Sequence, residues 1–442
     1  MTVLAFVIGI VVLVVGLAAS IALHELGHLL PAKAFGVRVG QYMIGFGPTL
    51  FSRRHGETEY GVKAIPLGGY ISMAGMYPPS TALREPAAVG AAESGDSGGR
   101  RAPGRFFSVM VQDARTANDE TLDGADDART FFRLPVWKRV VVMLGGPVMN
   151  LLLAIVLFTV LLSGIGLQTA STTIASLSPC VPAGASTADC AAETTPAEAA
   201  GLAEGDRILA VDGTPVATFA DASALIQDAP GRRLELLVER DGVERTLTVT
   251  PVPVAAEVVA PDGGTETAEV GFIGIRPESE YVRQPVWAGP AAAVENVGAV
   301  AGIMWQLPVK VADTAVSLFT GTERDPNGPL SVVGASVIAG EAAASDAPVL
   351  NRVSFIIGLL GSLNIALFVF NLIPLLPLDG GHVVVALWDG VKRGWAKLFR
   401  RPAPKPVDAT RLVPLTFVVV IGLVAMGGIL ILADLLNPIS LF

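Results

Sequence analysis

His24-Glu25-Leu26-Gly27-His28 stands inside an apolar run that begins at the second or third residue of the chain. On a helix, residues four apart share a face, so His24 and His28 can direct two imidazoles to one metal ion. Glu25 would lie on a neighbouring face, close enough to take a proton from metal-bound water. Ionisable side chains are costly in lipid and usually mark function there. The motif therefore predicts a membrane helix that carries a metal site; the alternative is a structural pair of histidines.

The composition is typical of a membrane protein, with 51% hydrophobic residues, 16% charged residues and a positive mean hydropathy. A membrane span needs roughly 20 apolar residues, and four stretches reach that length: 3–30, 138–165, 353–374 and 412–436. The first stretch has no basic residue before it and continues through the histidine motif. We therefore interpret it as a retained helix and not as a signal peptide.

The distribution of charge predicts how these spans are oriented. Residues 31–139 carry 14 Lys+Arg, and the short connection at 392–411 carries seven against one acid. Residues 167–352 hold 10 Lys+Arg against 24 Asp+Glu. By the positive-inside rule the first two regions are cytoplasmic, the third is outside, and both termini are outside. The net charge of −9 is a sum of opposite regions and does not indicate a partner. The apolar spans imply the lipid bilayer as a partner, and no nucleic-acid partner is expected.

The two cysteines, Cys180 and Cys190, both fall in the outside region. A pair ten residues apart in an oxidising compartment predicts a disulfide, with two free thiols as the alternative. Neither cysteine is expected to bind the metal, because both lie across the membrane from His24 and His28.

A zinc site needs a third protein ligand and an open position for water. The best candidate is Asp379, in the sequence NLIPLLPLDGGH at 371–382, which ends the third apolar stretch. Its two prolines break the helix, and the two glycines permit unusual backbone angles. Non-helical backbone at membrane depth is tolerated where it lines a buried or wet cavity. Since the first and third spans both run from outside to inside, Asp379 and the histidine motif are expected at the same depth.

Together these segments resemble the site-2 protease family, the intramembrane metalloproteases of peptidase family M50, in its bacterial branch of regulated intramembrane proteolysis. The matching segments are HELGH in the first span, GGPVMN at 145–150 and NLIPLLPLDGG at 371–381. Between the first two lie MIGFGPTLF and IPLGGYISM, which are similar to loop segments of that branch.

The resemblance implies a Zn²⁺ cofactor held by His24, His28 and Asp379, with Glu25 as the general base. It also implies that Asn371 contacts the substrate backbone or the developing oxyanion. Of the two remaining histidines, we interpret His382 as a structural residue or a residue that supports a metal ligand, and His55 as a solvent-facing residue.

Residues 36–73 are expected to form β structure, because apolar residues alternate around turn signals at Arg53-Arg54-His55-Gly56. A peptide bond inside a helix is shielded by its own hydrogen bonds, so a substrate must unwind before water can attack. A strand edge beside the metal can capture the unwound segment by β-addition, a role that the resemblance favours. The alternative is an ordinary cytoplasmic hairpin. Residues 78–130 are rich in Ala, Gly, Ser and charge, which predicts that the cytoplasmic insert at 78–137 is mostly flexible.

The outside region contains a segment, 168–253, that resembles a circularly permuted PDZ domain of bacterial proteases, with Ala220–Gln227 as its helix. Such a domain is expected either to bind an extended peptide or to act as a steric filter over the active site. Residues 254–352 are predicted to be a linker with a helix at Trp287–Leu318 on the outer membrane surface. A fifth span there would reverse the later topology and separate the two parts of the metal site.

We therefore predict a helical polytopic membrane protein with four transmembrane helices, a membrane-associated β-hairpin loop and an inserted extracytoplasmic α+β PDZ domain. Its predicted parts are a first span at 1–30, the β-rich loop at 31–77, the insert at 78–137, a second span at 138–165, the PDZ domain at 168–253, the linker at 254–352, a third span with the NxxPxxPxDGG motif at 353–382, a cytoplasmic loop at 383–411 and a fourth span at 412–436.

The predicted activity is zinc-dependent cleavage within transmembrane segments of single-pass proteins already shortened outside, such as anti-sigma factors or remnant signal peptides. The expected location is the bacterial cytoplasmic membrane. One alternative is a catalytically idle scaffold, which would have no reason to keep Glu25. Another is a metal transporter, which needs ionisable residues across the whole bilayer.

Overall fold

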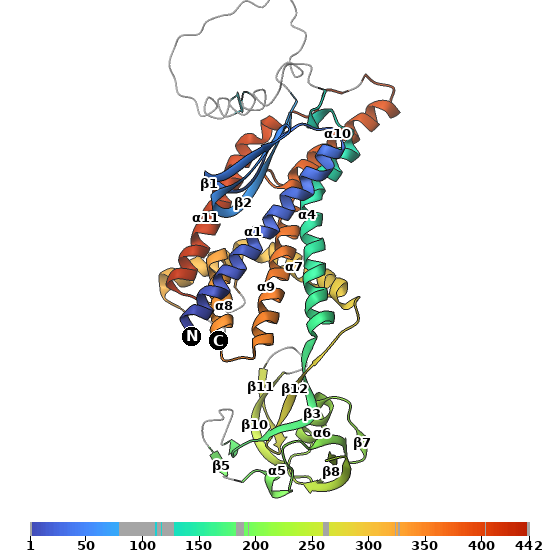
Figure 1. Ribbon diagram of the computed structural model, residues 1–442, viewed down its shortest axis with the longest axis vertical. Coiled ribbons are helices and arrows are strands. Elements are labelled where there is room, and N and C mark those ends of the chain that lie inside the picture. The colour runs from blue at the N-terminus through green and yellow to red at the C-terminus, as the bar shows by residue number, and fades with distance from the viewer. Residues whose placement is uncertain are drawn as a thin grey trace, which may run out of the picture. The chain divides into compact units, whose positions relative to one another are not determined.

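The computed structural model describes residues 2–78, 111–112, 116, 128–182, 190–192, 194–259, 265–322, 324–325, 328–402 and 404–439. The chain forms two compact units, Met1–Gly164 with Pro285–Phe442, and Ile165–Gln284, drawn as ribbons in Figure 1. Most of the predicted insert at 78–137 lies outside the described residues, so its flexibility stays a prediction.

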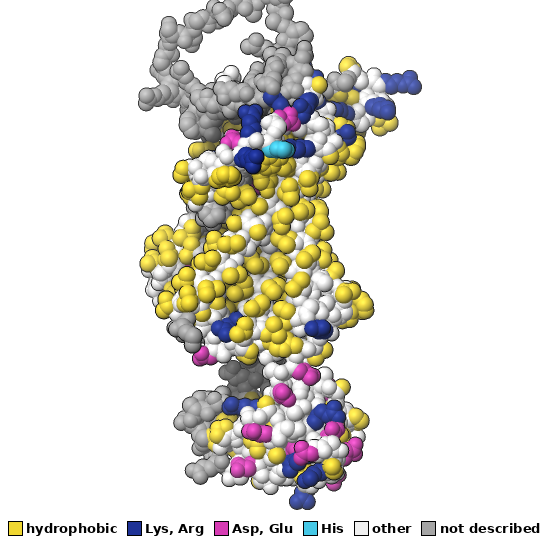
Figure 2. All heavy atoms as spheres, viewed as in Figure 1, with side chains coloured by type: hydrophobic (Ala, Val, Ile, Leu, Met, Phe, Trp, Pro, Cys, Tyr) yellow, Lys and Arg dark blue, Asp and Glu magenta, His cyan; other side chains and the backbone are white. Residues whose placement is uncertain are grey.

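Four long apolar helices form the body of the first unit. They are α1 (Thr2–Ala34), α4 (Val136–Thr159), α9 (Val349–Asn371) and α11 (Val413–Leu436). Each is long and apolar enough to cross a membrane, in agreement with the four predicted spans. A helix satisfies its own backbone groups, which is what lipid requires. α1 and α9 both pack against α4, and Figure 2 shows hydrophobic side chains gathered on the visible face of the first unit.

Short helical turns extend two of the spans. A π-helical turn at Val160–Ile165 continues α4, and a 3-10 turn at Ala409–Leu412 precedes α11. Another 3-10 turn, Phe131–Arg133, lies just before α4.

Two further helices, α7 (Ala288–Thr320) and α8 (Val332–Ala344), follow the second unit. The helix predicted at Trp287–Leu318 is therefore present as α7. It is not among the four helices with the composition of a span, and in Figure 1 it runs across them and contacts α4, α9 and α11. Its position on the outer membrane surface stays a prediction.

The helix α10 (Asp379–Leu398) corrects the loop predicted at 383–411. Its apolar residues recur three or four positions apart, as at Val384, Leu387 and Val391. That spacing is the period of an amphipathic helix. The sequence argument followed the basic residues of this segment and missed the period.

Two long strands, β1 (Val39–His55) and β2 (Thr58–Met73), form the β structure predicted at 36–73. They are joined by a tight turn in which Gly56 has a φ of 62°, a conformation that favours glycine.

Both strands fold back, so that the small sheet has more than two rows. Residues 41–44 pair with 59–62 on one side and with 69–72 on the other. Among the described residues, 69–73 pairs only with the 39–44 segment and so forms an edge of the sheet. Buried apolar side chains join the sheet to α1 and α4: Leu29, Ala32, Val37, Val39, Met73, Val142 and Met143.

The second unit is built around a sheet with the strand order β12-β3-β6-β8-β9, in which β7 also pairs with β6. Its strands are β3 (Leu167–Leu177), β6 (Arg207–Val211), β7 (Thr214–Pro215), β8 (Leu234–Arg240), β9 (Val243–Val249) and β12 (Ile275–Val282). Smaller sheets pair β4 (Val181–Pro182) with β5 (Cys190–Ala192) and β10 (Val252–Val259) with β11 (Thr265–Phe272). Its helices are α5 (Pro196–Ala199) and α6 (Phe219–Gln227).

The predicted limits of this unit, 168–253, are too short. β12 pairs with β3, at the opposite end of the unit in the sequence, so the unit continues to Gln284. Strand pairing over about a hundred positions leaves no local sequence signal. The predicted helix at Ala220–Gln227 is present as α6, and Cys180 is disulfide-bonded, as predicted for the cysteine pair.

Candidate metal centre

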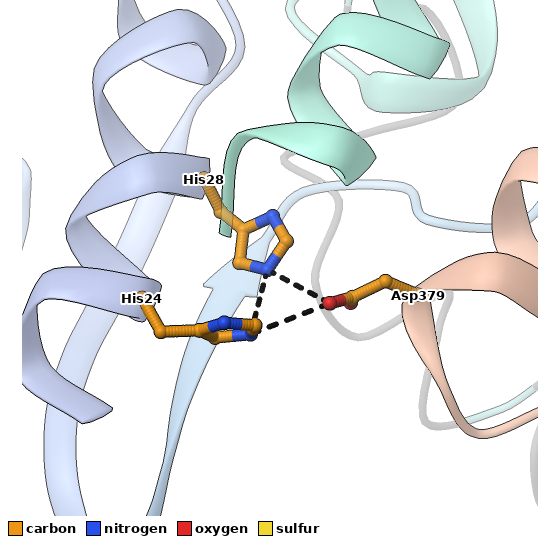
Figure 3. A group of neighbouring side chains, drawn as sticks. All are labelled: His24, His28 and Asp379. Atoms are coloured by element: carbon orange, nitrogen blue, oxygen red, sulfur yellow. Dashed lines mark hydrogen bonds and ion pairs between the residues drawn. The ribbon is translucent and has the colours of Figure 1, made fainter. Parts of the chain in front are cut away.

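Three side chains from two distant parts of the chain point toward one another in the first unit (Figure 3). His24 and His28 come from α1, and Asp379 is the first residue of α10. The atoms His24 Nε2, His28 Nε2 and Asp379 Oδ2 lie 3.3 Å from one another. A tetrahedral zinc with bonds of about 2.0–2.1 Å holds its ligand atoms about 3.3 Å apart. The donor atoms and their spacing therefore fit zinc with three protein ligands.

The carboxylate of Asp379 supports this interpretation. Its Oδ2 is buried, and no residue in the described part of the chain donates a hydrogen bond to it. The two neighbouring imidazole nitrogens can form ion pairs with it only when protonated, whereas metal ligands are deprotonated. A buried oxygen without a donor is costly, and a cation bound at this point removes that cost.

One face of α4 positions the two imidazoles. His28 Nδ1 lies 2.8 Å from the carbonyl oxygen of Val142; with its proton on Nδ1, the ring donates there and keeps a lone pair on Nε2. His24 Nδ1 lies 3.1 Å from the Nδ2 of Asn150, a fully buried residue. Between these contacts, a Cβ on Gly146 would lie 2.2 Å from His28 Nε2. Val142, Gly146 and Asn150 are four residues apart and so share a face of the helix.

Two facing glycines bring α1 and α4 close together. A Cβ on Gly27 would lie 2.2 Å from the carbonyl oxygen of Gly145. A Cβ on Gly145 would lie 2.0 Å from the carbonyl oxygen of Gly27. Small residues allow such close helix crossings in membranes. The glycine of HELGH and the first glycine of GGPVMN thus set the helix separation on which the ligand geometry depends.

The chain break after α9 positions Asp379. α9 ends at Asn371, ahead of both prolines as predicted, and turns connect it to α10. The prediction of unusual backbone angles at Gly380 and Gly381 is wrong, because both residues lie within α10 and neither has a positive φ. Glycine is needed here because a side chain has no room: a Cβ on Gly380 would lie 2.4 Å from the carbonyl oxygen of Ile373.

A buried ion pair holds α10 against α4. Arg139 Nη2 donates to Asp389 Oδ2 at 2.9 Å, and both side chains are buried. Asp389 Oδ1 also accepts a hydrogen bond from the backbone N–H of Val407. Breaking a buried pair of this kind leaves an uncompensated charge, which costs about 3–5 kcal/mol. The sequence argument did not find this pair, because its members are 250 positions apart.

Glu25 is buried next to β2 and is not part of the cluster of His24, His28 and Asp379. A Cβ on Gly69 would lie 2.9 Å from the Cγ of Glu25, so this glycine allows the edge strand to pass directly over the acid. The hydroxyl of Tyr42 on β1 donates to the carbonyl oxygen of Ala22 at 2.7 Å and ties the same sheet to α1. A carboxylate next to a zinc ligand set, but outside it, can act as a general base.

The other residues singled out from the sequence lie at different places. Asn371 is the last residue of α9, and its Nδ2 donates to the carbonyl oxygen of Leu367 at 3.0 Å. The His382 ring lies near that of Tyr77, with centroids 6.1 Å apart and planes tilted by 30°, and His382 does not belong to the metal cluster. His55 is exposed at the end of β1.

Comparison of the whole sequence with known proteins identifies the family of this chain. The profile of Peptidase family M50 matches residues 12–400. Zinc metalloprotease Rip1 of Mycobacterium tuberculosis is 34% identical over 461 residues, and the match covers 99% of each chain. Rip1 of Mycolicibacterium smegmatis is 34% identical over 464 residues, with 99% of each chain covered. Metalloprotease MmpA of Caulobacter vibrioides is 29% identical over 409 residues, with 88% of each chain covered.

This chain belongs to peptidase family M50, the site-2 protease family. It is a zinc metalloprotease with helices that can span a membrane. The family and the cofactor implied by the sequence resemblance are thus confirmed.

Proposed function

We propose that this enzyme holds its zinc with His24, His28 and Asp379 and cuts the transmembrane segments of single-pass membrane proteins. The observation that carries the proposal is the set of three donor atoms, 3.3 Å apart, two of them on an apolar helix of 33 residues. A peptidase that acts only in water gains nothing from ligands on such a helix, since ionisable groups in lipid are costly. A substrate inside the membrane explains their position.

His24, His28 and Asp379 would hold the zinc, which when bound would supply Lewis-acid chemistry and make a water reactive at neutral pH. Glu25 takes the proton of the attacking water and returns it to the leaving amine. Asn371 turns its amide from its own helix toward the substrate and donates a hydrogen bond to the scissile carbonyl oxygen. The burial of Glu25 and His28 excludes bulk water, which strengthens every electrostatic contact at the site.

The edge of the small sheet is the proposed binding place for the unwound substrate. The 69–73 segment passes over Glu25 at Gly69. An extended peptide that pairs with this edge satisfies its backbone groups as it leaves its helix. The same pairing brings its peptide bonds alongside the acid that serves as base. Substrates with helix-weakening Gly, Pro, Ser or Asn in the span should therefore be preferred.

We propose that the second unit is a PDZ-type domain outside the cytoplasmic membrane, with both chain termini also outside. Its sheet, its helix α6 and its acidic composition support this assignment. It either binds an extended peptide or excludes substrates whose outer part has not been shortened. The substrates that fit such a device are pre-trimmed membrane proteins, such as anti-sigma factors or remnant signal peptides.

Replacing the proposed base tests the function. In Glu25→Gln, zinc should stay bound while cleavage of a helical reporter substrate in proteoliposomes stops, because a base is removed and no ligand is lost. Glu204→Gln, an exposed residue of the second unit, is the matched control and should cleave normally. Wild-type cleavage by Glu25→Gln would overturn the assignment. Mass spectrometry of the new terminus should place the cut within the membrane-spanning segment of the reporter.

A further inference from the structure

Asn150 makes a contact that does not match the chemistry of the neighbouring ligand. The residue is fully buried on α4, and its Nδ2 lies 3.1 Å from His24 Nδ1. Its Oδ1 is also buried, and no described residue donates a hydrogen bond to it. An amide placed this way has its donor against the ring and its acceptor unused.

The protonation of a zinc-binding imidazole decides which end of the amide should face it. A ring that binds zinc through Nε2 has its lone pair there and carries its proton on Nδ1. His24 Nδ1 is then a donor and needs an acceptor, as His28 Nδ1 finds one in the carbonyl oxygen of Val142. The Nδ2 of Asn150 is itself a donor. Two donors at 3.1 Å repel each other.

Exchanging the two ends of the amide resolves the conflict. The oxygen and nitrogen of an Asn side chain have nearly the same shape, and their placement follows from the surrounding hydrogen bonds. After the exchange, the oxygen accepts the Nδ1–H of His24. The amide nitrogen, with its two N–H donors, then takes the buried position that the carbonyl oxygen held, and a contact between two donors becomes a hydrogen bond.

We propose that Asn150 is a positioning residue, whose carboxamide oxygen accepts the Nδ1–H of His24 and so directs the Nε2 lone pair to the zinc. The inference rests on the proposed function, in which His24 is a ligand. In this arrangement α4 supports both imidazoles, because the carbonyl oxygen of Val142 accepts from His28 and the side-chain amide of Asn150 accepts from His24. Groups that orient ligand histidines typically change metal affinity by about 10- to 100-fold when removed.

Two substitutions of similar size separate this role from mere packing. Asn150→Leu fills the space without any hydrogen bond, and zinc affinity, measured by chelator competition on the purified full chain, should fall by about 10- to 100-fold. Asn150→Asp, when ionised, keeps an acceptor and has no donor, so its zinc affinity should not show the loss of about 10-fold or more that removal of the support causes. If the amide nitrogen were the real partner, Asp would set an acceptor against a lone pair and would weaken zinc binding as much as Leu. That result would overturn the proposal.

Asn364→Leu is the matched control, because Asn364 is also fully buried in a membrane helix and donates to Ser20. Its zinc affinity should be unchanged, which shows that losing a buried amide alone does not release the metal. A wild-type affinity in Asn150→Leu would contradict the inference.

A spectroscopic measurement reads the proton directly. The chain has four histidines, so ¹⁵N-histidine NMR with single His variants can assign each ring. His24 should carry its proton on Nδ1 in the zinc-bound wild type and in Asn150→Asp. A proton on Nε2 would refute the proposal.

His24→Ala distinguishes the two levels of the argument. If that variant still binds zinc with wild-type affinity, the proposed ligand set is wrong. If it loses zinc while Asn150→Leu keeps it, the ligand set stands and only the role of Asn150 fails.

Discussion

The prediction that tests the ligand geometry most directly is Gly146→Ala. The added Cβ would lie 2.2 Å from His28 Nε2 and 2.8 Å from His24 Cε1, whereas ordinary contacts begin at 3.4 Å. The His28 ring must therefore move by about 1.2 Å, and zinc sites tolerate only about 0.2 Å. α4 could relieve the clash only by moving away from α1, which would open the close contact between Gly27 and Gly145.

The expected result is a loss of zinc affinity on the order of 100-fold or more. The displacement affects a proposed ligand itself, whereas the loss of an outer support alone lowers affinity by about 10- to 100-fold. Helix propensity works in the opposite direction, because Ala is favoured over Gly in a helix by about 1 kcal/mol. The variant should therefore fold, and its defect should appear in metal binding.

The assay is zinc content by mass spectrometry together with chelator competition, and thermal unfolding in detergent reports the fold. Gly422→Ala in α11 is the control: nothing lies within 4 Å of its added Cβ, so zinc binding should be normal. If Gly146→Ala bound zinc as tightly as the wild type, the packing of the imidazoles over α4 would be misassigned.

Three further predictions concern other parts of the chain. Asn371→Ala should lower the cleavage rate by about 100- to 1,000-fold with zinc content unchanged; an unchanged rate would make it a packing residue. Arg324→Met should destabilise the first unit by about 3–5 kcal/mol, because it leaves the buried Asp434 carboxylate unpaired. Asp434→Asn in that background should restore part of the loss, as measured by unfolding midpoints in detergent, and no recovery would contradict the ion-pair argument. Burial acts to raise the pKa of Asp206, but hydrogen bonds from Arg240 and the N–H of Ala203 hold it below its usual value of 3.8. Since the pKa of Asp206 is lower in the folded state than in the unfolded state, the second unit should lose stability as pH falls below about 5. The Asp206→Asn variant should lose less stability over the same pH range. Hydrogen exchange of β6 and β8 in the full chain measures the loss, and equal acid sensitivity of the two proteins would count against the prediction.

Local patterns in the sequence determined a large part of this protein. The four apolar helices follow from composition alone, because a span must satisfy its backbone within itself. The spacing of His24 and His28 follows from the helical period. The prolines after Asn371 marked the end of α9 for the same kind of local reason. The prediction of a loop at 383–411 was wrong for the part that forms α10, because it gave more weight to the basic residues than to the helical period.

Only the tertiary structure decided how these local pieces meet. His28 contacts Val142 across 114 positions, and His24 contacts Asn150 across 126. The period of one helix says which residues share a face, but it does not say which residue of another helix faces them. That choice depends on the separation and register of α1 and α4, which the contact between Gly27 and Gly145 sets.

The same reason explains the pairing of β12 with β3 and of Arg139 with Asp389. Each is a contact between segments that have no local pattern in common, so these contacts form and stabilise the protein only once the chain has folded. The sequence thus determined which residues could bind the metal. The packing of three helices decided that the donor atoms lie 3.3 Å apart, because close-packed side chains leave few alternative positions.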